Sequence, residues 1–67
     1  MFKMIEVVGV SPVGFSEAVK DGIDKVLASG KKVHFFQVLE QRGAVRNDEL
    51  REFQVIIRVA TEFPERI

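Results

Sequence analysis

Residues 50–63, LREFQVIIRVATEF, carry the clearest structural pattern in this chain. Their side chains alternate with period two, which is the repeat of a β-strand with one buried face. The odd-numbered positions are almost entirely apolar and comprise Phe53, Val55, Ile57, Val59, Thr61 and Phe63. The even-numbered positions are mixed and comprise Glu52, Gln54, Ile56, Arg58, Ala60 and Glu62. We therefore predict a long strand with one apolar face and one mixed face.

A second strand precedes this one and is expected to pair with it. Residues 33–39 also alternate with period two, and the pattern continues toward residue 45. The polar residues 46–49 have the composition of a turn, so we predict a long antiparallel hairpin. Unbroken alternation would place His34, Phe36, Val38, Glu40 and Arg42 on one face and Val33, Phe35, Gln37, Leu39 and Gln41 on the other.

The N-terminal half predicts one more strand and one helix. Residues 2–8 are rich in β-forming side chains. Apolar side chains recur at helical spacing over residues 15–27, which indicates an amphipathic helix. Gly30 follows this segment and is typical of the left-handed residue that ends a helix. Ser11 and Ser16 are both candidate caps, so the residue at which the helix begins stays open.

These elements predict a single α+β domain over residues 1–67, in the order β-α-β-β. The helix should cover one face of a three-stranded antiparallel sheet, because a uniformly apolar face needs a partner. Besides the odd positions of the last strand, this face includes Ile5, Val7, Phe36 and Val38. The second face mixes apolar Met4, Val8, Val33, Phe35, Leu39 and Ile56 with polar Glu6, Gln37, Gln41, Glu52, Gln54 and Arg58. Such a mixture is typical of a partly wet subunit interface that can close around a polar aromatic ligand.

The composition narrows the class of function. A chain of 67 residues without cysteine has a small core and no disulfide support, so we expect association between copies. The 10 basic and 10 acidic side chains cancel, which argues against nucleic acid or an anionic membrane as the partner. No apolar run approaches about 20 residues, the length that spans a bilayer, and we expect a cytoplasmic protein. Because no catalytic motif or set of metal ligands has recognisable spacing, we expect neither an enzyme nor a metal site.

Segments along nearly the whole chain resemble one family. They are FKMIEVVGVSP (residues 2–12), FSEAVKDGIDKV (15–26), FFQVLEQRG (35–43) and EFQVIIRV (52–59). In this order they resemble the dodecins, small flavin-binding proteins whose β-α-β-β protomers assemble as hollow spherical dodecamers. The spacing from Phe35 to Gln54 matches family members without a gap. The resemblance implies a hollow homododecamer.

The resemblance also implies a flavin site. In dodecins, two flavins stack at each two-fold axis between tryptophans of neighbouring subunits, and a glutamine of the last strand hydrogen-bonds the ring edge. Gln54 matches that glutamine, whereas Phe35 stands where the tryptophan would be. Arg42 and Lys3 match basic positions near the phosphate of FMN. The implied cofactor-binding residues are therefore Phe35, Gln54, Arg42 and Lys3.

The chemistry of these residues suits a flavin, although each has another interpretation. Phe35 offers a stacking face and Gln54 offers both a donor and an acceptor. The alternatives are interface packing for Phe35, an interface amide for Gln54, and solvated residues or salt bridges to Glu6, Glu40 or Glu52 for Arg42 and Lys3. We expect non-enzymatic binding, storage and buffering of riboflavin or FMN, with FAD as a further candidate. The alternative is a dodecin-like structural or cation-holding assembly that has lost flavin binding.

Overall fold

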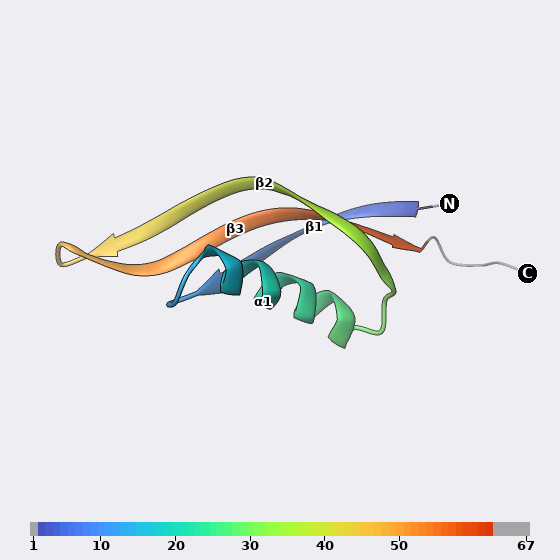
Figure 1. Cartoon of the computed structure of the whole chain (residues 1–67), viewed down its shortest axis with the longest axis horizontal. Coiled ribbons are helices and arrows are strands. Elements are labelled where there is room, and N and C mark those ends of the chain that lie inside the picture. The colour runs from blue at the N-terminus through green and yellow to red at the C-terminus, as the bar shows by residue number, and fades with distance from the viewer. Residues whose placement is uncertain (1, 63–67) are drawn as a thin grey trace, which may run out of the picture.

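The helix and strands follow one another in the predicted order. A computed structural model describes residues 2–62. It contains strand β1 (Phe2–Ser11), helix α1 (Phe15–Ala28), strand β2 (Val33–Arg46) and strand β3 (Glu49–Glu62). The sheet has the order β1-β3-β2, and both neighbouring pairs are antiparallel (Figure 1). The predicted α+β architecture, with one helix on a three-stranded antiparallel sheet, is confirmed.

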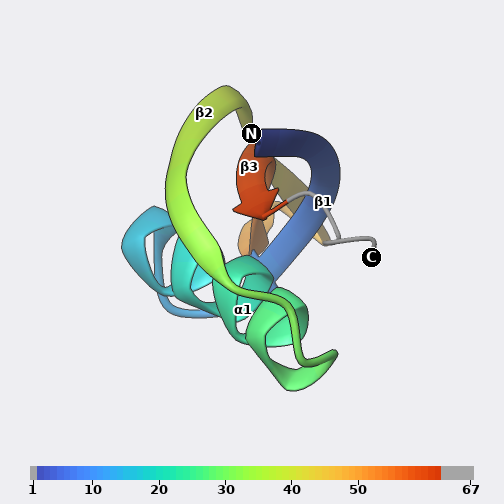
Figure 2. The ribbon, with the colours of Figure 1, turned by 90° about the vertical axis from the view of Figure 1, so that its right-hand side faces the viewer.

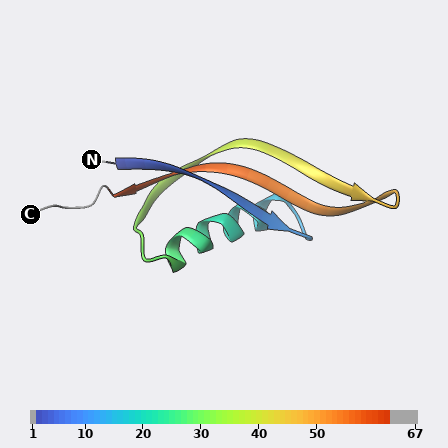
Figure 3. The same ribbon diagram turned by 180° about the vertical axis from the view of Figure 1, so that it is seen from behind.

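Strands β2 and β3 form the long hairpin that the alternating patterns predicted. Its turn residues Asn47 and Asp48 have φ angles of 54° and 61°, a left-handed pair that suits the twist of a two-residue hairpin loop. β1 pairs with β3 only as far as Phe53, so the tip of the hairpin extends beyond the end of β1 (Figure 1 and Figure 3). The molecule is therefore elongated, with extents of 54 × 20 × 14 Å.

Helix α1 packs against one face of the sheet only (Figure 2). The buried apolar core between them consists of Ala18, Val26, Val55, Ile57 and Val59. At Gly9 the strand and the helix approach so closely that an added Cβ would collide with the carbonyl oxygen of Ala18 and lie 2.8 Å from the amide nitrogen of Gly22. Glycine at position 9 is therefore required for this packing.

The helix begins between the two starts that the serine candidates predicted. Gly14 is the N-cap residue, and no side chain caps the first turn. Ser11 still belongs to β1, and its Oγ accepts a hydrogen bond from the Val13 N–H at 3.0 Å. Ser16 lies inside the first turn, so both serine candidates were wrong. At the other end, Gly30 has a φ of 88° and its N–H donates to the Leu27 carbonyl at 2.9 Å, which confirms its predicted role.

Two charged side chains tie the helix to the outer edge of β1. The Val10 N–H donates to Asp21 Oδ2 at 2.9 Å, and Lys25 Nζ donates to the Val8 carbonyl at 3.4 Å. Lys25 Nζ also lies 3.1 Å from Asp21 Oδ2. The hydrogen bond from Val10, followed by Lys25, lowers the pKa of Asp21 below its ordinary value. Because β1 is an edge strand, these contacts also occupy backbone groups that would otherwise be free to pair.

Strand β2 lies largely outside the cover of the helix. Phe36 and Val38 share the helix side of the sheet as predicted, yet they are 46% and 36% exposed because α1 packs mainly on β1 and β3. Val33 pairs with Thr61 and packs against the core, so its assignment to the second face was wrong. Phe63, assigned to the helix side, lies outside the described residues. No helix within residues 2–62 is long and apolar enough to cross a membrane.

Candidate functional site

The side of the sheet that faces away from α1, here called the open face, carries mixed side chains as predicted. Cross-strand partners lie on the same face, so the register assigns its members. They are Phe2, Met4, Glu6, Val8 and Val10 of β1; Glu52, Gln54, Ile56, Arg58 and Ala60 of β3; and Phe35, Gln37, Glu40 and Arg42 of β2. Three of the four predicted binding residues, Phe35, Gln54 and Arg42, therefore share this face.

A bulge in β2 is what brings Arg42 to the open face. β2 carries an extra residue, Leu39, between Val38, which pairs with Ile57, and Glu40, which pairs with Ile56. An inserted residue moves every later side chain of the strand to the other face. Unbroken alternation therefore assigned the wrong face to Glu40, Gln41 and Arg42. The available signal was that unbroken alternation places the charged residues Glu40 and Arg42 on the face that is otherwise mostly apolar.

Gln54 lies at the centre of a short line of hydrogen bonds. Arg42 Nε donates to Gln54 Oε1 at 2.7 Å, and Gln54 Nε2 donates to Glu52 Oε1 at 3.1 Å. Glu40 stands beside this Arg42–Gln54–Glu52 chain, with its Oε2 3.9 Å from Arg42 Nη1. The contacts with the guanidinium and the carboxylate are charge-assisted. Sequence reasoning treated Glu52 only as an ion-pair partner and missed its contact with the amide.

Phe35 belongs to an aromatic cluster at the other end of the open face. The ring of Phe2 lies 5.7 Å from that of Phe35 in a perpendicular arrangement and 4.7 Å from that of His34. Phe2 and Phe35 are both about half exposed, whereas Ala60 of the strand between them is fully buried. His34 Nε2 lies 3.9 Å from Glu62 Oε1. Phe2 carried no predicted role, because its proximity to Phe35 depends on the strand order.

The aromatic cluster and the Arg42–Gln54–Glu52 chain are well separated within one copy. Phe35 pairs with Ala60 of β3, which is six residues from Gln54 along the same strand. At a rise of about 3.3 Å per residue, this separation is about 20 Å. Arg58 lies between them on the same face and reaches Glu6 Oε2 with its Nη2 at 3.4 Å. One chain therefore presents the predicted stacking residue and the predicted ring-edge residue at two different places.

Lys3 is not brought to the open face. It pairs with Thr61, whose row carries the buried side chains beneath the helix, and the Thr61 hydroxyl donates to the Lys3 carbonyl at 3.2 Å. Within one chain, Lys3 thus lies on the opposite side of the sheet from Phe35, Gln54 and Arg42.

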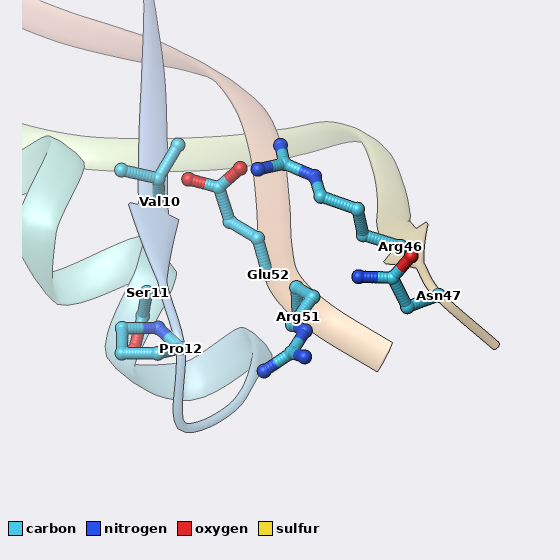
Figure 4. A pocket seen from close by; sticks show the side chains of 7 residues that line it. All are labelled: Val10, Ser11, Pro12, Arg46, Asn47, Arg51 and Glu52. Atoms are coloured by element: carbon cyan, nitrogen blue, oxygen red, sulfur yellow. The ribbon is translucent and has the colours of Figure 1, made fainter. Parts of the chain in front are cut away.

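A cavity opens beside the Arg42–Gln54–Glu52 chain, between the end of β1 and the tip of the hairpin (Figure 4). Its volume is about 600 Å³, and its lining consists of Val10, Ser11, Pro12, Arg46, Asn47, Arg51 and Glu52. Glu52 therefore belongs both to the cavity and to the hydrogen-bond chain. Arg51, on the same wall, pairs with Glu49 at 3.0 Å. Glu52 is therefore the residue that joins the polar and charged lining of the cavity to the amide of Gln54.

Comparisons with known proteins agree with this fold. A family model described as Dodecin matches residues 1–63. A curated dodecin from Thermus thermophilus is 26% identical over 65 residues, which are 97% of this chain and 94% of the relative. The solved dodecin of Streptomyces coelicolor is 26% identical, with a TM-score of 0.92 and coverage of 98% and 94% of the two chains. A tryptophan-to-phenylalanine variant of the T. thermophilus dodecin is 28% identical, with a TM-score of 0.89 and coverage of 97% of both chains.

Proposed function

The chain belongs to the dodecin family, and from this membership we propose that it assembles as a hollow homododecamer that binds, stores and buffers a flavin without catalysis. Riboflavin and FMN are the proposed ligands, and FAD is a further candidate. The partners are other copies of the same chain and the flavin itself.

The separation of Phe35 from Gln54 is the observation that supports this proposal most. The two side chains share the open face but lie about 20 Å apart along β3. A small planar ligand that contacts both a Phe35 and a Gln54 side chain must therefore lie between two copies of the chain. The open face also has apolar surface to bury in such a contact, since Phe2, Met4, Val8 and Phe35 are each between 42% and 51% exposed.

Each proposed binding residue has a distinct task. Phe35 offers an aromatic face for offset stacking on the flavin ring. Gln54 offers a donor and an acceptor to the edge of a ring held by another copy. Arg42 donates one N–H to Gln54 and has further N–H groups for a phosphate. Lys3 lies on the other side of the sheet, so we assign it to a phosphate bound by a different copy.

Two measurements on the purified protein test the proposal. Light scattering should give a mass of about twelve chains. Titration with riboflavin, FMN and FAD should show saturable quenching of flavin fluorescence, and the relative affinities should identify the preferred ligand. A mass near that of a dimer would contradict the shell, and unchanged fluorescence with all of these flavins would contradict flavin binding.

A structural or cation-holding assembly is the second candidate, and Phe35 is the residue that favours it. A phenylalanine ring has less stacking surface than the tryptophan expected from the family resemblance. A calcium dodecin from Mycobacterium tuberculosis shares the fold at 20% identity and a TM-score of 0.85. Among residues 2–62 of one copy, no three His, Cys, Asp or Glu side chains gather closely enough to hold a metal ion. A colourless shell that leaves flavin fluorescence unchanged would favour this candidate over storage.

A further inference from the structure

Gln54 is held between one group that only donates hydrogen bonds and one group that only accepts them. Arg42 Nε donates to Gln54 Oε1, and Gln54 Nε2 donates to Glu52 Oε1. A guanidinium has no acceptor, and an ionised carboxylate has no donor. If the amide turned over, its NH₂ group would meet the guanidinium and its oxygen would meet the carboxylate. The amide of Gln54 therefore has one favourable orientation.

This orientation decides what Gln54 can offer to a ligand. A side-chain amide has two N–H donors and an oxygen with two lone pairs. Glu52 uses one N–H and Arg42 uses one lone pair, so one donor and one acceptor remain. A planar ring with a C=O next to an N–H complements this pair, because its C=O can accept from Nε2 and its N–H can donate to Oε1. A ring that lacks the N–H leaves the acceptor unused.

We propose that Glu52 is a positioning residue that holds the amide of Gln54 in this orientation and thereby selects rings with a C=O and N–H edge. The inference rests on the proposed flavin binding and adds a specificity-determining residue to it. Glu52 also lines the cavity between the end of β1 and the tip of the hairpin (Figure 4). Without its carboxylate, only the hydrogen bond from Arg42 would hold the amide in this orientation.

The first test needs no ligand. Glu52→Gln keeps the size of the side chain but lets it donate as well as accept, so only Arg42 still favours one orientation of the amide. Glu49→Gln is the matched control, because Glu49 pairs with Arg51 rather than with Gln54. In the ¹⁵N-labelled assembly, the side-chain NH₂ resonances of Gln54 are identified by their loss in Gln54→Ala. They should shift in Glu52→Gln and stay in place in Glu49→Gln.

The second test measures specificity with lumiflavin and 3-methyllumiflavin, in which a methyl group replaces the ring N–H. The unmodified protein should prefer lumiflavin by about tenfold, because the methylated ring leaves a polar group unpaired. Glu52→Gln should reduce this preference to about twofold, whereas Glu49→Gln should retain it. Unshifted Gln54 resonances in Glu52→Gln, or a fully retained preference, would overturn the role of Glu52. Failure of the unmodified protein to bind either ring would overturn flavin binding instead, and the resonances would still decide the role of Glu52.

Discussion

The two faces of the sheet are built from the same strands but differ in what covers them. On the helix side, Ile57 is completely buried between α1 and the sheet. On the open face, its neighbour Ile56 lies between Val8 and Glu40 and is only partly buried. The first environment is completed by the chain itself. The second leaves apolar and polar side chains partly exposed within one copy.

This difference separates residues that maintain the fold from residues available for binding. The helix side uses close contacts such as that between Gly9 and Ala18, where an added side chain has no room. The open face contains exposed aromatic rings and a hydrogen-bonded amide, which have unused surface and unused hydrogen-bonding capacity. Substitutions on the two faces should therefore change different measured quantities.

The largest effect is expected for Ile57→Ala. Removal of these buried methyl and methylene groups leaves a cavity under the helix and should lower the free energy of unfolding by about 2–5 kcal/mol. Ile56→Ala deletes the same atoms from the open face and should lower it by less than half as much, while weakening association. Denaturant unfolding followed by circular dichroism, with light scattering on the same samples, measures both quantities. Equal losses of unfolding free energy would show that the faces do not differ in this way.

Gln54→Ala should have the next largest effect, on ligand affinity rather than on the fold. Loss of the amide removes the proposed contact with the ring edge and should weaken flavin binding by about tenfold. Gln37→Ala, which changes the same residue type on the same face opposite Arg58, is the matched control and should change affinity little. Fluorescence titration measures the affinities. Equal affinities for both variants and the unmodified protein would place the ring edge elsewhere.

Phe35→Trp should have a smaller effect in the opposite direction. The larger ring increases the stacking surface and should tighten flavin binding by about threefold to tenfold. Quenching at saturation should also deepen, because tryptophan is oxidised more readily than phenylalanine. Phe36→Trp, on the helix side of the same strand, serves as the control. If both variants bind and quench like the unmodified protein, Phe35 does not contact the ring.

The order of elements followed from the sequence because each element has its own periodicity. The apolar repeat of residues 15–27 could only suit a helix, and the alternation of residues 50–63 identified β3 and its buried face. The helix start was missed because a strand that continues through Ser11 leaves Gly14, which has no side chain, at the cap. A serine near a helix start therefore does not establish which residue caps it.

The candidate site was only partly predictable, because it depends on register. Period-two alternation assumes that no residue is inserted, so it could not show that Leu39 moves Arg42 onto the face of Gln54. Phe35 and Gln54 were correctly placed on one face, but their separation appears only when each is matched to its partner in the ladder. The contact of Phe2 with Phe35 also requires the strand order, which places β1 and β2 on either side of β3.

The smallest effect is expected where the helix meets the edge of β1. The pKa of Asp21 is lowered first by the Val10 N–H and then by Lys25, so the ionised carboxylate favours the folded state. This contribution is present above the ordinary aspartate pKa of about 3.9 and is lost as the pH falls through the lower pKa of the folded state. Asp21→Asn should therefore lower Tm slightly at neutral pH, and the difference from the unmodified protein should disappear in acid.

The matched control for this prediction is Asp24→Asn, which removes a charge from the same helix but leaves the contact of Asp21 with Val10 and Lys25 intact. Thermal unfolding across the acidic range compares the two variants. The Tm difference of Asp21→Asn should decline with decreasing pH, whereas that of Asp24→Asn should lack this decline. A pH-independent difference for Asp21→Asn would mean that packing of the side chain, rather than its charge, joins the helix to β1. In that case the contact between α1 and β1 would depend on side-chain packing alone. The helix side would then differ even more from the open face, which carries the hydrogen-bonded side chains of Arg42, Gln54 and Glu52.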